Sequence, residues 1–531
     1  MLATTTIGSS ATSFLVSLIL VIQILNGIFK RRRQHKLSLG KGCQAGKEYK
    51  QVDPYLGLVF LYRNIRDFRA RTFLHAWQQR LDKTGRTIWV WILGSRVLVI
   101  LDPENVKAVL ATSSDDFERG PHMRAAFRVV ANGIFAADGE HWQTSRALFR
   151  PSFARDEIHD TERFETHFRN LLHLLPTDGR MVDLQPLLDR FAMDTATDLL
   201  FGKSTGSLTA ESDEEAAKFY GSAKYCLWAI FRDWNLGLLG RILPDRTYSE
   251  AREYIYKTVD RYVRIALESN AKAVIGESST AKPEQRKRYI LLNHLAEQNK
   301  DPIMLRDQSI SALVGGAETT ANLLSNLLYV LARRPETWTK LRAEALNFDI
   351  TTLDRERMKD AVYLSYCINE CQYLHLILVV EANTNPEREA LRLHPVVPLT
   401  TRWCNKDTIL PRGGGPDEAH PLLVPQGTSV YVAFYPMHRR KDIFGDDADE
   451  FRPERWATLK PGWGFTPFGG GPRICIGQQF ALAEATYAML RMLQTYEAIE
   501  AIDDKPWVEN IAISANSASG CKVYLHAASR T

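Results

Sequence analysis

The sequence predicts a mainly α-helical domain with a smaller β portion, built around one long helix and preceded by one N-terminal transmembrane helix. Three observations lead to this fold class. Residues 12–29 form an uncharged apolar run, several segments within residues 135–333 carry apolar residues three and four positions apart, and residues 396–435 alternate in polarity and are rich in β-branched residues. The composition, 45% hydrophobic and 24% charged, is that of an ordinary globular protein.

The apolar run at residues 12–29 is the first element. Its length is close to the ~20 residues that a helix needs to cross a bilayer. Four basic residues follow at 30–33, whereas a cleaved signal peptide carries its positive charge before the apolar run. Residues 1–35 are therefore predicted to be a membrane anchor with a basic flank on the cytoplasmic side. The N-terminus would then lie in the lumen, and residues 36–531 would form the cytosolic domain.

Charge and cysteine content narrow the classes of protein further. A net charge of +5 is too weak and too dispersed for a nucleic-acid-binding protein, and no nucleic-acid partner is expected. The cysteines number seven, which is odd, and none forms a CxxC pair. This argues against a disulfide framework and favours a reducing compartment, in agreement with a cytosolic domain.

Between the anchor and about residue 395 the pattern is mostly helical. Apolar spacing predicts helices at residues 135–150, 188–202, 249–268 and 302–333, and a polar, Lys-rich surface loop at 270–287. Asp301 and Pro302 provide an N-cap and a first-turn proline for the long helix, which is predicted to run to Arg334 before Pro335. Its middle contains "GGAETT" at 315–320, where glycines and threonines weaken a helix. Taken alone, this stretch could be a packing notch against another helix.

The β portion follows at residues 396–435. The segment "LLVPQGTSVYVAFY" alternates and is β-branched and aromatic, and residues 413–416, "GGGP", provide turn material. These features predict a small sheet late in the chain.

The strongest chemical signal is "FTPFGGGPRICIGQQFALAEA" at residues 465–485. A loop rich in glycine and proline brings Cys475 to the start of a helix near Gly477, where the helix dipole and free N–H groups favour a thiolate. A lone cysteine is more often buried and inert. Here Phe468, Gly471, Arg473, Cys475 and Gly477 reproduce FxxGxRxCxG. The segment thus resembles the cysteine-ligand loop of the cytochrome P450 haem-thiolate monooxygenases.

The resemblance implies a cofactor and residues that hold it. Cys475 would be the axial ligand of heme b, iron protoporphyrin IX, with Phe468 beside the cofactor. Arg473 and the WxxxR pair of Trp142 and Arg146, on one face of the helix in "EHWQTSRALFRPSF", would donate hydrogen bonds to the haem propionates.

By the same resemblance, "GGAETT" corresponds to the oxygen-binding groove of the family. Glu318 and Thr319 would be the acid–alcohol pair that delivers protons to dioxygen, and Gly315 and Gly316 would leave room beside the haem. Glu318 stands where aspartate is commoner, and Ala317 where a larger residue is often found, so the geometry of proton delivery can differ here.

A structural network is implied by an ExxR motif, Glu389 with Arg392, and by Arg455 in "EFRPERW". However, the helix that should lead into ExxR, "YLSYCINE", breaks off at Glu370. Removing residues 371–389 would rejoin it to "ALRLHP", and the codons of this segment can encode intron splice signals. We therefore interpret residues 371–389 as a retained intron. A genuine surface insertion is the alternative, although "LHLILVV" is poorly suited to a surface loop.

Segments 132–153, 410–427 and 437–456 resemble the fungal membrane-bound n-alkane and fatty-acid terminal hydroxylases. This implies that one oxygen atom of O2 is inserted into a C–H bond of a long apolar substrate at the chain end. Electrons would come from NADPH through cytochrome P450 reductase, with cytochrome b5 as a possible second donor, at the endoplasmic reticulum membrane. Three alternatives remain: a secondary-metabolite or xenobiotic hydroxylase, an isomerase or peroxide-using haem-thiolate enzyme, which usually lacks the acid–alcohol pair, and an inactive mis-spliced product.

Overall fold

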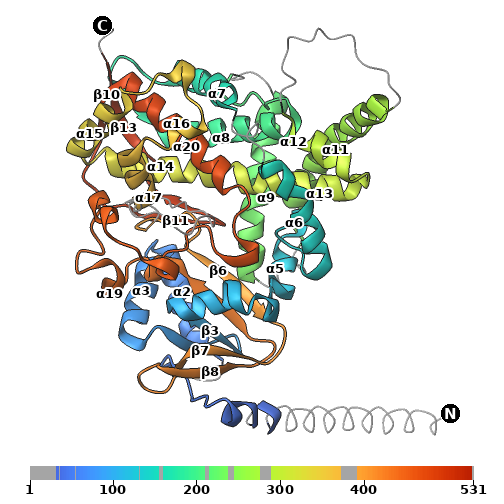
Figure 1. Cartoon of the computed structure of the whole chain (residues 1–531), viewed down its shortest axis with the longest axis vertical. Helices are drawn as coiled ribbons and strands as arrows, with labels where there is room; N and C mark the ends of the chain where they lie inside the picture. Colours follow the sequence, from blue (N-terminus) through green and yellow to red (C-terminus); the bar gives the residue numbers. More distant parts are fainter. Residues whose placement is uncertain are drawn as a thin grey trace, which may run out of the picture.

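The computed structural model describes residues 32–34, 36–53, 56–130, 132–154, 160–209, 214–236, 244–274, 289–371 and 392–528. In Figure 1 most helices gather in the upper part of the molecule, and the largest sheet lies below them with α2 and α3. The predicted mainly α domain with a smaller β portion is confirmed for these residues.

The helices that the structure describes are α2 (Leu58–Arg69), α3 (Phe73–Thr84), α4 (Pro103–Lys107), α5 (Gly120–Ala126), α6 (Gly139–Phe153), α7 (Thr161–Leu174), α8 (Leu184–Phe201), α9 (Glu214–Leu236), α11 (Arg246–Val274), α12 (Leu291–Gln298), α13 (Pro302–Gly316), α14 (Thr319–Leu331), α15 (Pro335–Ala345), α16 (Arg355–Met358), α17 (Val362–Cys371), α18 (Phe434–Met437), α19 (Lys441–Phe444) and α20 (Gln478–Thr495). The strands are β1 (Lys47–Glu48), β2 (Thr87–Ile92), β3 (Ser95–Ile100), β4 (Phe117–Glu118), β5 (Met181–Asp183), β6 (Leu399–Cys404), β7 (Thr408–Gly414), β8 (His420–Val424), β9 (Ser429–Ala433), β10 (Tyr496–Ala501), β11 (Glu509–Ile511), β12 (Ala515–Ser517) and β13 (Lys522–Ala527).

The largest sheet joins early and late parts of the chain. Its strand order is β1-β2-β3-β9-β6-β4. Strands β2 and β3 form an antiparallel hairpin, and β3 then pairs in parallel with β9, Leu98 opposite Val430. The described chain is mostly helical up to residue 395, as predicted, but the strands at residues 87–100 were not expected. The strands "TIWVWI" and "SRVLVI" are apolar on consecutive positions, and short runs of this kind have no period that separates strand from helix.

The predicted central helix exists, but it is divided in two. It begins as predicted, because the Asp301 side chain accepts a hydrogen bond from the Ile303 N–H, 2.9 Å away, and Pro302 occupies the first turn. Helix α13 then ends at Gly316, and α14 begins at Thr319 and ends at Leu331, not at Arg334. The break falls where glycines weaken the helix and the Thr319 hydroxyl bonds to the Gly315 carbonyl oxygen at 2.6 Å.

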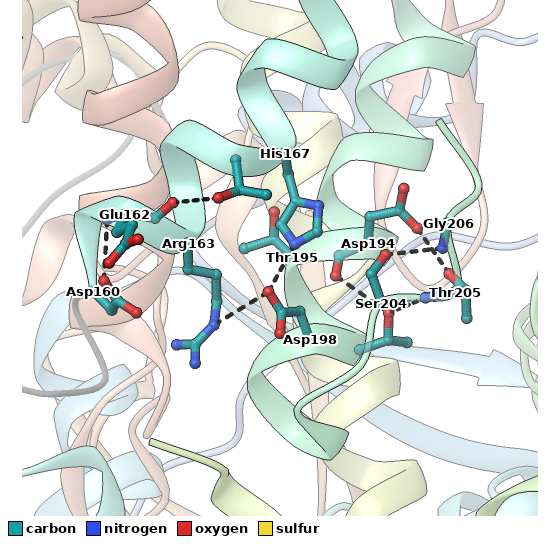
Figure 2. Close-up of polar contacts among 12 residues, drawn as sticks. Asp160, Glu162, Arg163, His167, Asp194, Thr195, Asp198, Ser204, Thr205 and Gly206 are labelled. Carbon is teal, nitrogen blue, oxygen red and sulfur yellow. Dashed lines mark hydrogen bonds and ion pairs between the residues drawn. The ribbon is translucent and has the colours of Figure 1, made fainter. Parts of the chain in front are cut away.

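Helix α8 supports both halves of this central helix and is fixed by buried polar contacts (Figure 2). His167 of α7 lies 2.9 Å from the Asp198 carboxylate of α8, and the Arg163 guanidinium lies 3.7 Å from the same oxygen. All three side chains are buried. Because unpaired buried charges are costly, these contacts specify how α7 and α8 pack.

Within the described ranges, no helix is long and apolar enough to cross a bilayer. The predicted anchor at residues 12–29 lies outside those ranges, as do the predicted insertion from residue 372 onward and most of the predicted loop at 270–287. Helix α11 extends into the last of these, as far as Val274.

Candidate functional site: the cysteine loop and its surroundings

The cysteine loop is held by its own backbone and by close packing. The Cys475 N–H donates to the Phe468 carbonyl oxygen at 3.0 Å, and α20 begins at Gln478, with Gly477 as its N-cap, as predicted. Gly471 has φ +65°, and a Cβ there would lie 2.0 Å from the carbonyl oxygen of Leu110. Only glycine therefore lets the loop approach this neighbouring segment so closely.

Opposing effects act on the Cys475 thiol. Its side chain is exposed to solvent, yet it is crowded by the surrounding chain, and this desolvation raises its pKa. The Gly477 N–H and the Arg146 guanidinium oppose the rise without reversing it. The helix start thus favours the thiolate, as expected, through the Gly477 N–H, while desolvation acts on the pKa in the opposite direction. A coordinating metal ion would reverse this balance, since it deprotonates a thiol outright.

Two arginines join the cysteine loop to helix α6 and to the residues just before α6. The Arg146 guanidinium of α6 donates to the Ile474 carbonyl oxygen at 2.7 Å. Arg473 donates to the Ala137 carbonyl oxygen at 3.1 Å and to the Asp138 carboxylate at 2.8 Å. The Arg473 guanidinium also lies over the ring of Trp142, 4.3 Å from its centroid. The structure therefore brings together Trp142 and Arg146 of the WxxxR pair with Arg473 and Cys475 of the cysteine loop.

The same place holds two arginines that the sequence did not single out. Arg119, just before α5, and Arg402, in β6, interact electrostatically with each other, and Arg473 interacts with both. Burial and this mutual repulsion lower the pKa of Arg119 to about 10 and that of Arg402 well below its usual value. Asp138 is the carboxylate that all three face. The cluster therefore carries excess buried positive charge.

One atom of this cluster has no acceptor. The Nε of Arg119 is buried and has no hydrogen-bond partner among the residues that the structure describes. An orphaned buried donor is rare and costly, and surplus guanidinium groups are suited to carboxylate or phosphate oxygens. This arrangement fits an anionic ligand beside Arg119, Arg402 and Arg473.

The predicted acid–alcohol pair lies at the break in the central helix. Glu318 is 8% exposed, and burial raises the pKa of its carboxyl group, with a further rise from Asp189. Lys224, Ser514 and Asn322 oppose this rise in part. A raised pKa keeps more of this carboxyl group protonated, as a proton donor requires. Thr319, the next residue, is half-buried.

The two glycines before this pair have different neighbours. A Cβ on Gly315 would lie 3.3 Å from the ring of Phe135, whereas a Cβ on Gly316 would lie 3.5 Å from the Cβ of Ala196 in α8. Gly315 thus borders the loop that precedes α6, and Gly316 faces helix α8.

The predicted ExxR network is described in part, because Glu389 lies outside the described residues. Arg392 and Arg455 are both buried, and both donate to the carbonyl oxygen of Glu450, at 2.8 and 3.2 Å. Arg455 also pairs with Asp447 at 2.7 Å. The two arginines therefore do meet, through the 447–450 turn.

Comparison with known proteins places this site in a family. Residues 53–382 and 388–516 match the family model "Cytochrome P450". Cytochrome P450 monooxygenase himC of Aspergillus japonicus is 38% identical over 98% of this chain and 90% of its own length. Cytochrome P450 52A12 of Debaryomyces hansenii is 36% identical over 86% of this chain and 87% of its own. Cytochrome P450 52A10 of Candida maltosa is 38% identical over 77% of each chain. The chain belongs to the cytochrome P450 family, whose members are haem monooxygenases.

The residues present fit the cofactor of this family. Haem carries two propionate groups, and the buried surplus of guanidinium groups with an orphaned Arg119 Nε suits such carboxylates. Arg119 and Arg402 were missed because their local sequences, "FERGPHM" and "LTTRWC", do not differ from those around an ordinary surface arginine. Only the pairing of β4 with β6, Phe117 opposite Cys404, brings them together.

Proposed function

We propose that this cytochrome P450 hydroxylates a long apolar chain, an n-alkane or a fatty acid, at or near its end, with a haem that Cys475 would ligate. The observation that carries this proposal is the junction of the Cys475 loop with α6 through Arg146 and Arg473, next to the excess positive charge of Arg119 and Arg402. That junction supplies a thiol ligand and propionate donors in one place.

When bound, haem supplies the redox chemistry that inserts one oxygen atom of O2 into a C–H bond. The chain's own residues do the rest. The Cys475 sulfur would ligate the iron, and the Gly477 N–H and the Arg146 guanidinium favour its deprotonation. Arg119, Arg402 and Arg473, with Trp142, would hold and orient the propionates.

Glu318 and Thr319 hold and move the protons that the reaction consumes. The raised pKa of Glu318 keeps a proton on its carboxyl group. Glu318 also interacts electrostatically with Asp189 and with Lys224 of α9, and these two residues form an ion pair with each other. Thr319 carries a hydroxyl group at the break in the helix, next in sequence to that carboxyl group. An acid followed by an alcohol is suited to relaying a proton to a substrate-side acceptor.

The substrate class is supported by similarity. The segments at residues 132–153, 410–427 and 437–456 resemble those of the fungal alkane and fatty-acid hydroxylases, and relatives named cytochrome P450 52A12 and 52A10 are 36–38% identical. A hydroxylase of a fungal secondary metabolite is the second candidate, because monooxygenases outside that numbered group are equally similar, himC among them at 38% identity.

We further propose that NADPH-cytochrome P450 reductase supplies the electrons, with cytochrome b5 as an additional donor, at the endoplasmic reticulum membrane. The uncharged run at residues 12–29 followed by basic residues supports an anchor with a lumenal N-terminus. We also propose that residues 371–389 derive from a retained intron. The family match includes residues 371–382 and leaves out 383–387, so this proposal rests on the interrupted lead helix "YLSYCINE" and the rejoined "ALRLHP".

One experiment tests the function and the state of the chain together. The full chain and a variant lacking residues 371–389 are expressed, and their reduced carbon monoxide difference spectra are recorded. Each is then supplied with reductase, NADPH and a series of n-alkanes and fatty acids, and products are identified by mass spectrometry. Terminal alcohols are the expected products. Haem-loaded protein that consumes NADPH but hydroxylates none of these chains would contradict the substrate class.

A further inference from the structure

The two halves of the central helix use buried polar side chains to hold two separate segments of the chain. On α13, Gln308 is 1% exposed, and its amide oxygen accepts a hydrogen bond from the Ile134 N–H at 3.2 Å. Its amide nitrogen donates to the Ser145 hydroxyl of α6 at 2.7 Å. Its neighbour Asp307, also 1% exposed, accepts from the Asn132 N–H at 3.2 Å. Adjacent residues of α13 thus hold the segment 132–138, called here the 132–138 loop.

The fit between this loop and α13 is close. A Cβ on Gly133 would lie 2.0 Å from the Ser311 hydroxyl oxygen and 2.8 Å from the Asp307 carbonyl oxygen, so only glycine allows the approach. The Gly133 carbonyl oxygen then accepts from the N–H groups of Ala136 and Ala137, both at 3.0 Å. The loop is a tight turn, and its hydrogen bonds to Gln308 and Asp307 leave its backbone little conformational freedom.

The loop connects the two parts of the candidate site. Phe135 lies beside Gly315, whose carbonyl oxygen accepts the Thr319 hydroxyl hydrogen. Two residues later, Ala137 accepts a hydrogen bond from Arg473 of the cysteine loop. The Phe135 ring is half-buried and stacks on Phe127, with centroids 6.0 Å apart. The loop thus places the apolar Phe135 ring beside the proton-bearing break, while its Ala137 backbone contacts the cysteine loop.

On α14, Asn322 makes the corresponding contacts on another segment. Its amide nitrogen donates to the Ser514 hydroxyl at 2.8 Å, and its amide oxygen accepts from the Asn516 side chain at 2.8 Å. Ser514 and Asn516 lie at the β11–β12 hairpin, next to Glu318. Asn322 is therefore a comparison for hydrogen exchange alone: it is a buried amide on the same central helix that holds a different segment, and it also acts on Glu318.

We propose that Gln308 is a specificity-determining positioning residue: by holding the Ile134 amide, it fixes Phe135 beside Gly315 and thereby determines which carbon of the apolar chain is oxidised. This inference rests on the proposed function, because it concerns the position of attack on that substrate. Gln308 acts through Phe135 and does not itself touch the reacting atoms. Loss of its hydrogen bond would let the loop move while the cysteine loop keeps its own contacts with Arg146 and Gly477.

The test uses the full-length, haem-loaded protein and the variants Gln308→Met, Asn322→Ala, Ser145→Ala and Phe135→Ala. Amide hydrogen exchange is followed by mass spectrometry in peptides that cover residues 132–138 and 513–517. Losing one buried hydrogen bond should speed exchange roughly 2- to 10-fold. We expect this rise at 132–138 in Gln308→Met, at 513–517 in Asn322→Ala, and at neither segment in Ser145→Ala, which removes the contact of Gln308 with α6 and a bond within α6 to the His141 carbonyl oxygen but keeps the Ile134 contact.

The second measurement is the ratio of terminal to subterminal alcohols from one n-alkane. Gln308→Met and Phe135→Ala should both shift this ratio at least about threefold, in the same direction. Unchanged exchange at 132–138 in Gln308→Met, or an unchanged ratio, would overturn the inference. If Gln308→Met does not retain haem, Gln308→Asn, which is one methylene shorter and cannot keep both hydrogen bonds of Gln308, is measured in its place against the same two outcomes. A wild-type protein that makes no alcohol from the alkane would instead contradict the proposed substrate class.

Discussion

Thr319 donates its hydroxyl hydrogen to the carbonyl oxygen of Gly315, 2.6 Å away and one turn earlier in the divided central helix. This bond competes with the regular helical bonding at that turn, and it fixes the rotamer of the side chain. The hydroxyl oxygen is thereby held in one orientation with its lone pairs still able to accept a hydrogen bond.

Thr319→Ala should leave haem content and substrate binding near the wild-type level but uncouple NADPH consumption from product formation. Without the hydroxyl group, the ordered proton route is lost, and electrons are diverted to hydrogen peroxide. The yield of product per NADPH should fall at least about tenfold. Thr319→Ser keeps the hydroxyl group and should restore most of the coupling, whereas equal coupling in all three proteins would reduce Thr319 to a helix-packing residue.

Cys475→Ser should abolish the thiolate-type band in the reduced carbon monoxide difference spectrum and all turnover, because a serine hydroxyl group is a far poorer ligand for iron. Cys43→Ser is the matched control, since Cys43 is a half-buried free cysteine remote in sequence from the loop. A persistent thiolate-type band in Cys475→Ser would show that another cysteine ligates the iron.

Arg119→Met should weaken haem binding roughly 10- to 100-fold, as expected for the loss of a charge-assisted hydrogen bond. In the haem-free chain the same substitution should be neutral or stabilising, because it removes repulsion between Arg119 and the guanidinium groups of Arg402 and Arg473. Haem affinity and the unfolding of the haem-free chain are measured in parallel. Arg412→Met, which removes a surface contact with Glu104, provides the control. Loss of stability without loss of haem affinity would contradict the propionate role.

Glu484 provides a test of stability against pH. This glutamate of α20 is 1% exposed, and burial raises its pKa to about 8, partly offset by the hydroxyl groups of Thr195 and Thr320. Since the folded-state pKa lies above the unfolded value, its contribution to stability is complete below about pH 4.5 and is lost as the pH rises through about 8.

The free energy of unfolding of the haem-loaded protein should therefore decrease between about pH 5 and pH 8, by up to ~1.4 kcal/mol per pH unit from this group. The melting temperature should fall over the same range. Glu484→Gln is neutral at every pH and should flatten this slope and raise the melting temperature at pH 8. A slope identical in the two proteins would mean that Glu484 is charged in the folded state.

The insertion is tested on transcripts. If residues 371–389 are intronic, most reads from the source organism should join Glu370 to a serine codon followed by Leu391. The spliced protein should also bind haem better, because a buried Arg392 that lost a carboxylate partner would cost about 3–5 kcal/mol. Transcripts that uniformly retain the segment, with equal haem binding by the full chain and the deletion, would establish it as part of the protein.

Those parts of the fold and site that depend on local sequence could be predicted. The capping of α13 by Asp301, the start of α20 after Cys475 and the alternation in β9 are each determined within a few neighbouring residues. The glycines indicated a weak point near Ala317 and Glu318. They did not predict that the helix would be divided there, because tertiary contacts decide whether a weak turn stays helical.

What could not be predicted depends on contacts between residues far apart in sequence. Arg119 and Arg402 acquire their perturbed charge only when β4 and β6 pair. The Gln308 contact with Ile134 joins residues 174 positions apart, and the local sequence around neither residue predicts it. The helix start was expected to favour the Cys475 thiolate, and the Gly477 N–H acts in that direction, but the opposing desolvation is a property of the folded surroundings that the sequence does not contain.

The parallel pairing of β3 with β9 has a consequence for how the molecule comes into being. Leu98 leaves the ribosome about 330 residues before its partner Val430, and at roughly 5–20 residues per second that interval lasts on the order of 15 to 70 s. Throughout it, the apolar hairpin β2–β3 has an open edge, the kind of surface on which nascent chains aggregate. Biogenesis of this protein should therefore depend on chaperone capacity during translation more than its mostly helical architecture would suggest.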